Sequence, residues 1–169
     1  MAVTLVLPDG YQYAGAAIIS TFWLTFWQMF RVGRSRGKAG IPYPQLYAEK
    51  SEQSTSKDAL VFNCCQRAHQ NTLENLPMIL VRYVGLEVTG VYDGQSTTSS
   101  TAVTATKYPI LAASLCGAWV CFRTLYTLGY STGNPAKRNL YKSTILGGLT
   151  GLSLLSSATF TVAQHILAA

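Results

Sequence analysis

The sequence is poor in charge. Of its 169 residues only 12% are charged, whereas 49% are hydrophobic, and soluble domains usually carry about 25% charged residues. The mean hydropathy is positive at +0.19. This much apolar material excludes a disordered chain. The composition therefore predicts one compact membrane domain of several spans, and 169 residues suit a single domain.

Several common functional patterns are missing. The four cysteines are too sparse for a disulfide-stapled secreted module, and Cys64 and Cys65 are neighbours that we interpret as buried apolar residues. No cysteine stands at metal-ligand spacing from a histidine, so no metal site is expected. The sequence also has no glycine-rich phosphate loop, nucleotide-binding fingerprint or Ser/His/Asp constellation. The chemistry must come from other residues.

Long uncharged stretches predict the membrane spans. Residues 10–30 form an uncharged run of 21 residues, and residues 143–169 form one of 27. A bilayer core requires about 20 apolar residues of helix. Two further segments qualify less cleanly because they contain polar side chains. The expected fold is an all-α bundle of four transmembrane helices, over about 10–33, 59–85, 108–130 and 142–166.

Lysine and arginine are distributed unevenly between the loops. The loops after the first and before the fourth predicted helix hold nine of them, whereas the Ser/Thr-rich loop Leu86–Lys107 holds only Lys107. Basic loops stay in the cytosol, so both termini are expected on the other side. The net charge of +6 is then explained by topology and by contact with acidic lipid headgroups, and not by nucleic-acid binding.

Polar residues gather on one face of the second predicted helix. At 3.6 residues per turn they share a face about 100° wide: Asn63, Arg67, Gln70, Asn71 and Glu74. His69 falls on the far side, at about 200°.

The third predicted helix carries a similar stripe of Arg123, Tyr126 and Tyr130. A charge at a helix centre costs on the order of 2.5–3.5 kcal/mol to insert, so both stripes should face protein or a watery cavity. They lie at similar depth near the cytosolic side, close to Arg36. Arginines bind carboxylates and Glu74 suits an ammonium, so the stripes predict a site for a small polar ligand.

Three segments resemble one known family. They are FNCCQRAHQNTLENLP (Phe62–Pro77), FRTLYTLGYSTGNPAKR (Phe122–Arg138) and YPQLY (Tyr43–Tyr47). Together they resemble the MAPEG family, membrane proteins of eicosanoid and glutathione metabolism, and most closely its type-three microsomal glutathione S-transferase branch. The resemblance implies a homotrimer of four-helix bundles that binds glutathione between neighbouring subunits near the cytosolic side. It implies the endoplasmic reticulum membrane, with a mitochondrial membrane as the alternative.

The resemblance also implies roles for individual residues. Those expected to hold glutathione, the co-substrate, are Arg36, Arg67, His69, Asn71, Glu74, Arg123, Tyr126 and Tyr130. Arg138 is expected to activate the thiol, with Lys137 as an alternative one residue away. A free thiol has a pKa near 8.5 and reacts as the thiolate, which a nearby cation favours. The thiolate would attack a lipophilic electrophile dissolved in the membrane or reduce a lipid hydroperoxide.

This chain differs from the leukotriene C synthases of the family at two positions, which bears on the expected reaction. The leukotriene C synthases have a second arginine where this chain has Gly37, and a tyrosine where it has Asn75. Both differences favour glutathione transfer over leukotriene synthesis.

Other interpretations remain open from the residues alone. The polar face of the second helix could be a purely structural network, the two tyrosines could belong to an interfacial belt, and His69 could be a packing residue. The whole chain could be a non-catalytic structural subunit of a larger membrane complex, or a small carrier or channel that uses the polar stripe as a path.

Overall fold

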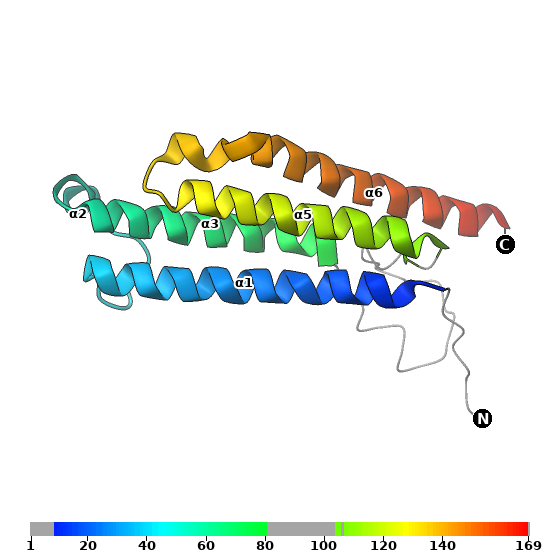
Figure 1. The fold of residues 1–169 in the computed structure, drawn as a ribbon, viewed down its shortest axis with the longest axis horizontal. Helices are drawn as coiled ribbons and strands as arrows, with labels where there is room; N and C mark the ends of the chain where they lie inside the picture. The colour runs from blue at the N-terminus through cyan, green and yellow to red at the C-terminus, as the bar shows by residue number, and fades with distance from the viewer. Residues whose placement is uncertain (1–8, 81–103, 106, 169) are drawn as a thin grey trace, which may run out of the picture. The chain divides into compact units, whose positions relative to one another are not determined.

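The computed structural model describes residues 9–80, 104–105 and 107–168, and its regular elements are helices (Figure 1). No strand occurs within these ranges, which confirms the all-α prediction. The elements are α1 (Tyr11–Ala39), α2 (Lys50–Thr55), α3 (Lys57–Leu80), α5 (Pro109–Tyr130), the 3₁₀ segment η1 (Pro135–Lys142) and α6 (Ser143–Ala168).

The helices differ from the predicted ranges mainly at their ends. α1 continues through the basic residues that follow the uncharged run and ends at Ala39. Arg36 therefore lies inside the helix. The short helix α2 and the segment η1 were not expected. Residues 81–85 of the second predicted helix, including Arg82, and residues 86–103 of the Ser/Thr-rich loop lie outside the described residues.

Two segments are long and apolar enough to cross a membrane, Pro109–Tyr130 and Pro135–Gln164. Within the described residues α1 and α3 do not reach the same apolarity, so their membrane spans stay a prediction. α1 nevertheless carries large apolar side chains that are more than half exposed: Phe22, Trp23, Phe26, Met29 and Phe30. A contiguous apolar face of this kind requires lipid or protein to cover it.

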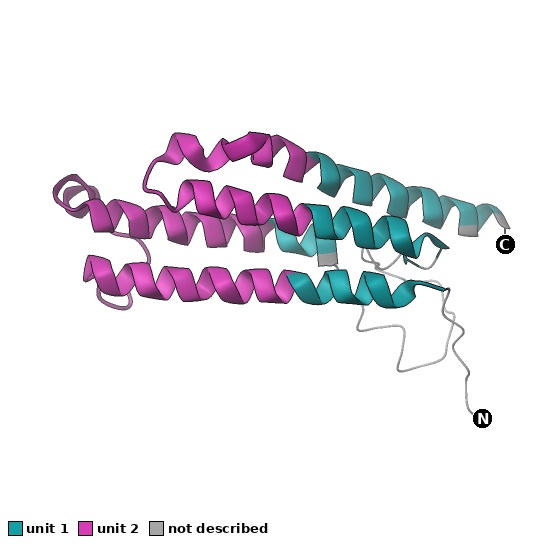
Figure 2. Cartoon of the chain, viewed as in Figure 1, with its two compact units in different colours: residues 1–20, 75–118, 149–169 teal, residues 21–74, 119–148 magenta. Residues whose placement is uncertain are grey.

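The chain forms two compact units (Figure 2), each drawing on several helices. The first unit covers residues 1–20, 75–118 and 149–169, and the second covers residues 21–74 and 119–148. In the first unit Ala14 packs with Ala105 and Ala112, and the hydroxyls of Thr104 and Ser157 are 3.0 Å apart. The candidate site residues all belong to the second unit.

A buried amide joins three helices in the second unit. Gln28 of α1 is 1% exposed, and its Nε2 donates to the hydroxyls of Thr72 on α3 (2.9 Å) and Thr127 on α5 (2.7 Å). Each hydroxyl in turn donates to a carbonyl of its own helix, at Ala68 (3.1 Å) and Arg123 (2.8 Å). Each threonine hydroxyl therefore donates within its own helix and accepts from the Gln28 amide. These bonds fix the relative positions of α1, α3 and α5.

Replacing Gln28 with leucine should destabilise the fold. The change keeps a similar volume but removes both bonds to the threonines, and hydrogen bonds between membrane helices contribute about 0.6 kcal/mol each and at most about 1.7. We expect a loss of about 1–2 kcal/mol in the free energy of unfolding, measured by denaturation in detergent micelles. Gln12→Leu is the matched control, because Gln12 is an exposed amide on the same helix. Equal unfolding of Gln28→Leu and the wild type would contradict this role.

Candidate functional site

The polar face of α3 displays an ion pair. Arg67 Nη1 lies 3.0 Å from Glu74 Oε1, two helical turns further along, and the two side chains are 44% and 46% exposed. A pair this exposed is accessible to a ligand and contributes little to stability. The predicted convergence of these two residues is therefore present on one helix, with charges of both signs open to a partner.

The polar stripe of α5 meets the same face. Arg123 Nη1 donates to Asn71 Oδ1 of α3 at 2.5 Å. Its guanidinium lies over the rings of Trp119 and Tyr126, 5.4 Å from each centroid. The rings of Tyr126 and Tyr130 are in edge contact, with centroids 5.6 Å apart. Arg123 is thus oriented by an amide oxygen and two aromatic faces, and it connects the two helices that carry the stripes.

Tyr126 lies at the centre of a cationic neighbourhood. Its side chain is buried, and it interacts electrostatically with Arg67, Arg123 and Arg138. These three cations come from α3, α5 and η1, which are distant in the sequence. The fold thereby gathers positive charge around one phenol, an arrangement suited to an anionic ligand.

Arg138 is carried by η1, which folds back closely against the end of α5. A Cβ built on Gly129 would lie only 2.1 Å from the carbonyl oxygen of Lys137, so only glycine permits this approach. Asn134 begins the segment by accepting a bond from the Ala136 amide at 3.0 Å, and the Ser143 hydroxyl donates to the Arg138 carbonyl at 3.2 Å. The Arg138 side chain itself is exposed.

Arg36 is engaged elsewhere. Its guanidinium lies between the rings of Tyr43 (4.4 Å) and Phe62 (4.5 Å), and the residue is only 7% exposed. Nη1 donates to the Gln45 carbonyl at 2.6 Å and, over longer distances, to the carbonyls of Ile41 and Pro42. Nη2 donates to the Leu46 carbonyl at 3.5 Å. In this chain Arg36 holds the loop that follows α1, and its direct contact with glutathione stays a prediction.

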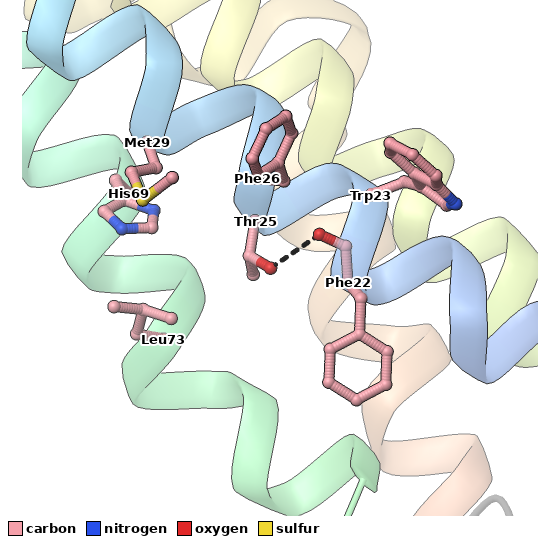
Figure 3. Close-up of a pocket in the computed structure, with 7 residues that line it drawn as sticks. All are labelled: Phe22, Trp23, Thr25, Phe26, Met29, His69 and Leu73. Atoms are coloured by element: carbon pink, nitrogen blue, oxygen red, sulfur yellow. Dashed lines mark hydrogen bonds between the residues drawn. The ribbon is translucent and has the colours of Figure 1, made fainter.

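His69 lies apart from Arg67, as its position on the helical wheel predicts. Its Nδ1 is 3.4 Å from Gln28 Oε1, and the ring borders a groove of about 600 Å³ between α1 and α3 (Figure 3). The other residues that line the groove are Phe22, Trp23, Thr25, Phe26, Met29 and Leu73. Apart from the imidazole and one threonine hydroxyl, this wall is apolar.

Sequence reasoning missed two residues of this unit. Gln28 was overlooked although it is the single amide of the aromatic segment Phe22–Phe30, which is a usable signal for a buried hydrogen-bonding role. Tyr47 lies in a loop, and its hydroxyl donates to Gln70 Oε1 on the polar face of α3. Nothing in the spacing of the loop residues could have indicated that this side chain reaches α3.

All four cysteines lie in the described part of the chain, and Cys121 is the one that is exposed. All four are free thiols, and Cys64, Cys65 and Cys116 are buried. Within the same residues no group of three or more His, Cys, Asp and Glu side chains could hold a metal ion. The chemistry that this arrangement offers is recognition by arginine, amide, carboxylate and phenol groups.

A protein-family model matches most of the chain. The family model described as MAPEG matches residues 13–158, which include every candidate site residue. The matching model describes the family as a whole, so the resemblance to the type-three branch stays a prediction. Proteins of this family are membrane proteins, and they include glutathione transferases and related enzymes. With the match covering most of its length, the chain belongs to the MAPEG family.

Proposed function

We propose that this chain is a membrane glutathione transferase whose activated thiolate attacks a lipophilic electrophile. The observation that carries the proposal is the meeting of the exposed Arg67–Glu74 pair with the Arg123–Asn71 bond on one face. Glutathione has two carboxylates, one ammonium and a thiol. Arginine side chains bind carboxylates through paired N–H donors, and Glu74 can bind the ammonium, so the charges of the cluster complement those of the ligand.

The exchange of partners on binding also favours this ligand. In the free chain Arg67 and Glu74 neutralise each other. The γ-glutamyl end of glutathione presents a carboxylate beside an ammonium, so it can replace one ion pair by two. Such an exchange leaves neither protein charge without a partner, so binding creates no uncompensated charge.

A second copy of the chain would complete the site, and we propose the homotrimer that the family resemblance implies. The candidate residues fall on two opposite faces of α3, with Arg67 on one and His69 on the other. In a ring of identical subunits the two faces of neighbouring chains can meet. The exposed apolar side chains along α1 favour such packing, because they require a cover of lipid or protein.

The chemistry follows from the thiol. Lowering its pKa by about two units requires roughly 2.7 kcal/mol of differential stabilisation, which a guanidinium in a partly dry site can supply. We propose Arg138 for this role, since it lies near Tyr126 and the other cations. The thiolate sulfur forms a bond to an electrophilic carbon as the leaving group departs. A lipid hydroperoxide would instead be reduced to the alcohol and water, with two glutathione molecules oxidised to the disulfide.

The setting proposed for this reaction is a lipid bilayer, most simply that of the endoplasmic reticulum. The two membrane-compatible segments and the family support a membrane, and the lipophilic substrate would reach the protein from the lipid. The competing function is a structural subunit without catalysis. Purified protein that neither binds glutathione nor conjugates it to a lipophilic aryl halide would favour that alternative.

Replacing Glu74 with alanine should weaken glutathione binding. The change removes the proposed ammonium contact and leaves Arg67 without its carboxylate, and a hydrogen bond to a charged group contributes about 1.5–3 kcal/mol. We expect the Kd for glutathione to rise at least tenfold in calorimetric titrations of detergent-purified protein. Asp58→Ala is the control, because Asp58 is an exposed carboxylate in the first turn of the same helix. An unchanged Kd for Glu74→Ala would remove this residue from the site.

A further inference from the structure

The loop between α1 and α2 is fixed from two sides. On one side the Arg36 guanidinium binds its backbone carbonyls, most closely that of Gln45 at 2.6 Å. On the other side the Asn63 amide of α3 pairs with both backbone groups of Ala48, accepting from its N–H at 2.7 Å and donating to its carbonyl at 2.8 Å. The loop therefore has little freedom, although it contains no regular secondary structure.

Tyr47 lies between these two fixed points. The Gln45 amide donates to the Tyr47 carbonyl at 2.9 Å and to Glu52 Oε2 at 2.7 Å, which ties the backbone of Tyr47 to the start of α2. With its neighbours on both sides bound, the Tyr47 side chain has a defined direction. It points onto α3, where its hydroxyl donates to Gln70 Oε1.

The phenol thereby lies on the face of α3 that carries the Arg67–Glu74 ion pair of the proposed site. Tyr47 interacts electrostatically with Arg67, Glu74 and Tyr130. Burial raises the pKa of Tyr47 above its ordinary value of 10, and this effect outweighs the opposing influence of Arg67. The phenol is thus protonated at neutral pH and can donate its proton to an acceptor.

We infer that Tyr47 is a further binding residue of the proposed glutathione site, where its hydroxyl donates to the γ-glutamyl carboxylate held by Arg67. Arg36 and Asn63 act as its positioning residues through the loop. This inference rests on the proposed function. The exchange of acceptor is favourable, because an O–H bond to a carboxylate is about twice as strong as one to a neutral amide oxygen such as that of Gln70.

The γ-glutamyl end is assigned from the neighbourhood of the phenol. Tyr47 bonds to Gln70 on the polar face of α3 and interacts electrostatically with both Arg67 and Glu74. The γ-glutamyl end is the part of glutathione that carries a carboxylate and an ammonium on one carbon. The glycine end has a carboxylate alone and would leave Glu74 without a partner. Tyr47 is therefore expected to act on specificity for the α-amino-acid end of the peptide.

Calorimetric titration of Tyr47→Phe with glutathione tests the inference. Phenylalanine keeps the ring, so the fold should persist, and the Kd is expected to rise about tenfold, the scale for a lost hydrogen bond to a charged group. Tyr43→Phe is the matched control, since it removes a hydroxyl from the same loop and keeps the ring that lies on Arg36. A Kd for Tyr47→Phe within twofold of the wild type would overturn the inference and leave the proposed function standing.

Two further measurements separate the alternatives. The glycine monoethyl ester of glutathione keeps the γ-glutamyl end, so the same tenfold ratio between Tyr47→Phe and the wild type is expected; a ratio near one would overturn the assignment of that end. Arg36→Ala should weaken binding in the wild type but add little in the Tyr47→Phe background, whereas full additivity would mean that Arg36 touches the ligand itself. Wild-type protein that does not bind glutathione would overturn the proposed function, and the inference with it.

Discussion

Alanine in place of Arg138 is expected to slow glutathione conjugation at least about 20-fold at pH 7, while the Kd for glutathione changes by less than tenfold. Without the guanidinium the thiol pKa should return from about 6.5 to about 8.5. The thiolate fraction at pH 7 then falls from roughly three quarters to about 3%. Binding should change less, because Arg67, Glu74 and Arg123 remain in place.

The effect of Arg138→Ala on the conjugation rate should depend on pH. A cation lowers the thiol pKa, so its removal matters most below the free value and should disappear above about pH 9.5, where the thiol ionises unaided. Conjugation rates between pH 6 and pH 10, recorded together with the ultraviolet absorbance of the thiolate, measure both quantities. Lys137→Ala is the matched control, since Lys137 is the neighbouring exposed cation. If Arg138→Ala conjugates as fast as the wild type and Lys137→Ala does not, Lys137 is the activating residue.

Alanine in place of Gly129 is expected to reduce the turnover number by up to about a hundredfold while the affinity for glutathione changes little. The new methyl group would lie 2.1 Å from the Lys137 carbonyl oxygen, and real Cβ contacts require at least about 3 Å. The backbone next to Arg138 must therefore shift by roughly 1 Å, a displacement that can cost about a hundredfold in rate. The three atoms nearest to that Cβ belong to Lys137 and Leu140 of η1, and none belongs to the residues of α3 that are proposed to hold glutathione.

The control for this prediction lies on the same helix. A Cβ on Gly117 of α5 would meet no atom within 4 Å, so Gly117→Ala should keep full activity and slightly raise stability through its better helix propensity. The measurements are kcat and the calorimetric Kd for each variant, with thermal unfolding to monitor the fold. Gly129→Ala protein with an unaltered kcat would show that the approach of η1 to α5 does not position the activating arginine.

The sequence predicted the polar face of α3 well, because that face depends on helical periodicity alone. Arg67 and Glu74 are seven residues apart, and any α-helix of this length brings such residues onto one side. The contact between Arg123 and Asn71 was expected more coarsely, from the similar depth of the two stripes. In both cases a regular helix converts sequence spacing into spatial position.

Other parts of the site depend on contacts that spacing does not encode. Tyr47 reaches α3 because Arg36 and Asn63 fix an irregular loop, and no periodic pattern describes such a loop. The position of η1 depends on its close approach to Gly129 of α5. This requirement for glycine is apparent only from the three-dimensional arrangement of α5 and η1. The absence of charge was an incomplete guide to the membrane spans. The two segments confirmed as membrane-compatible are Pro109–Tyr130, which contains Arg123, and Pro135–Gln164, whereas the uncharged run of residues 10–30 is not among them.

The amide of Gln28 has a consequence for ligand capture. Turning α3 by one residue about its axis would carry Thr72 away by about 100° and break the link to α1. The same turn would swing Arg67 and Asn71 away from α5. The rotation of α3 about its axis is therefore already fixed in the free protein. Binding of a ligand then costs little conformational entropy for ordering this helix. The backbones of α1, α3 and α5 in the second unit should accordingly superimpose in the empty and occupied states.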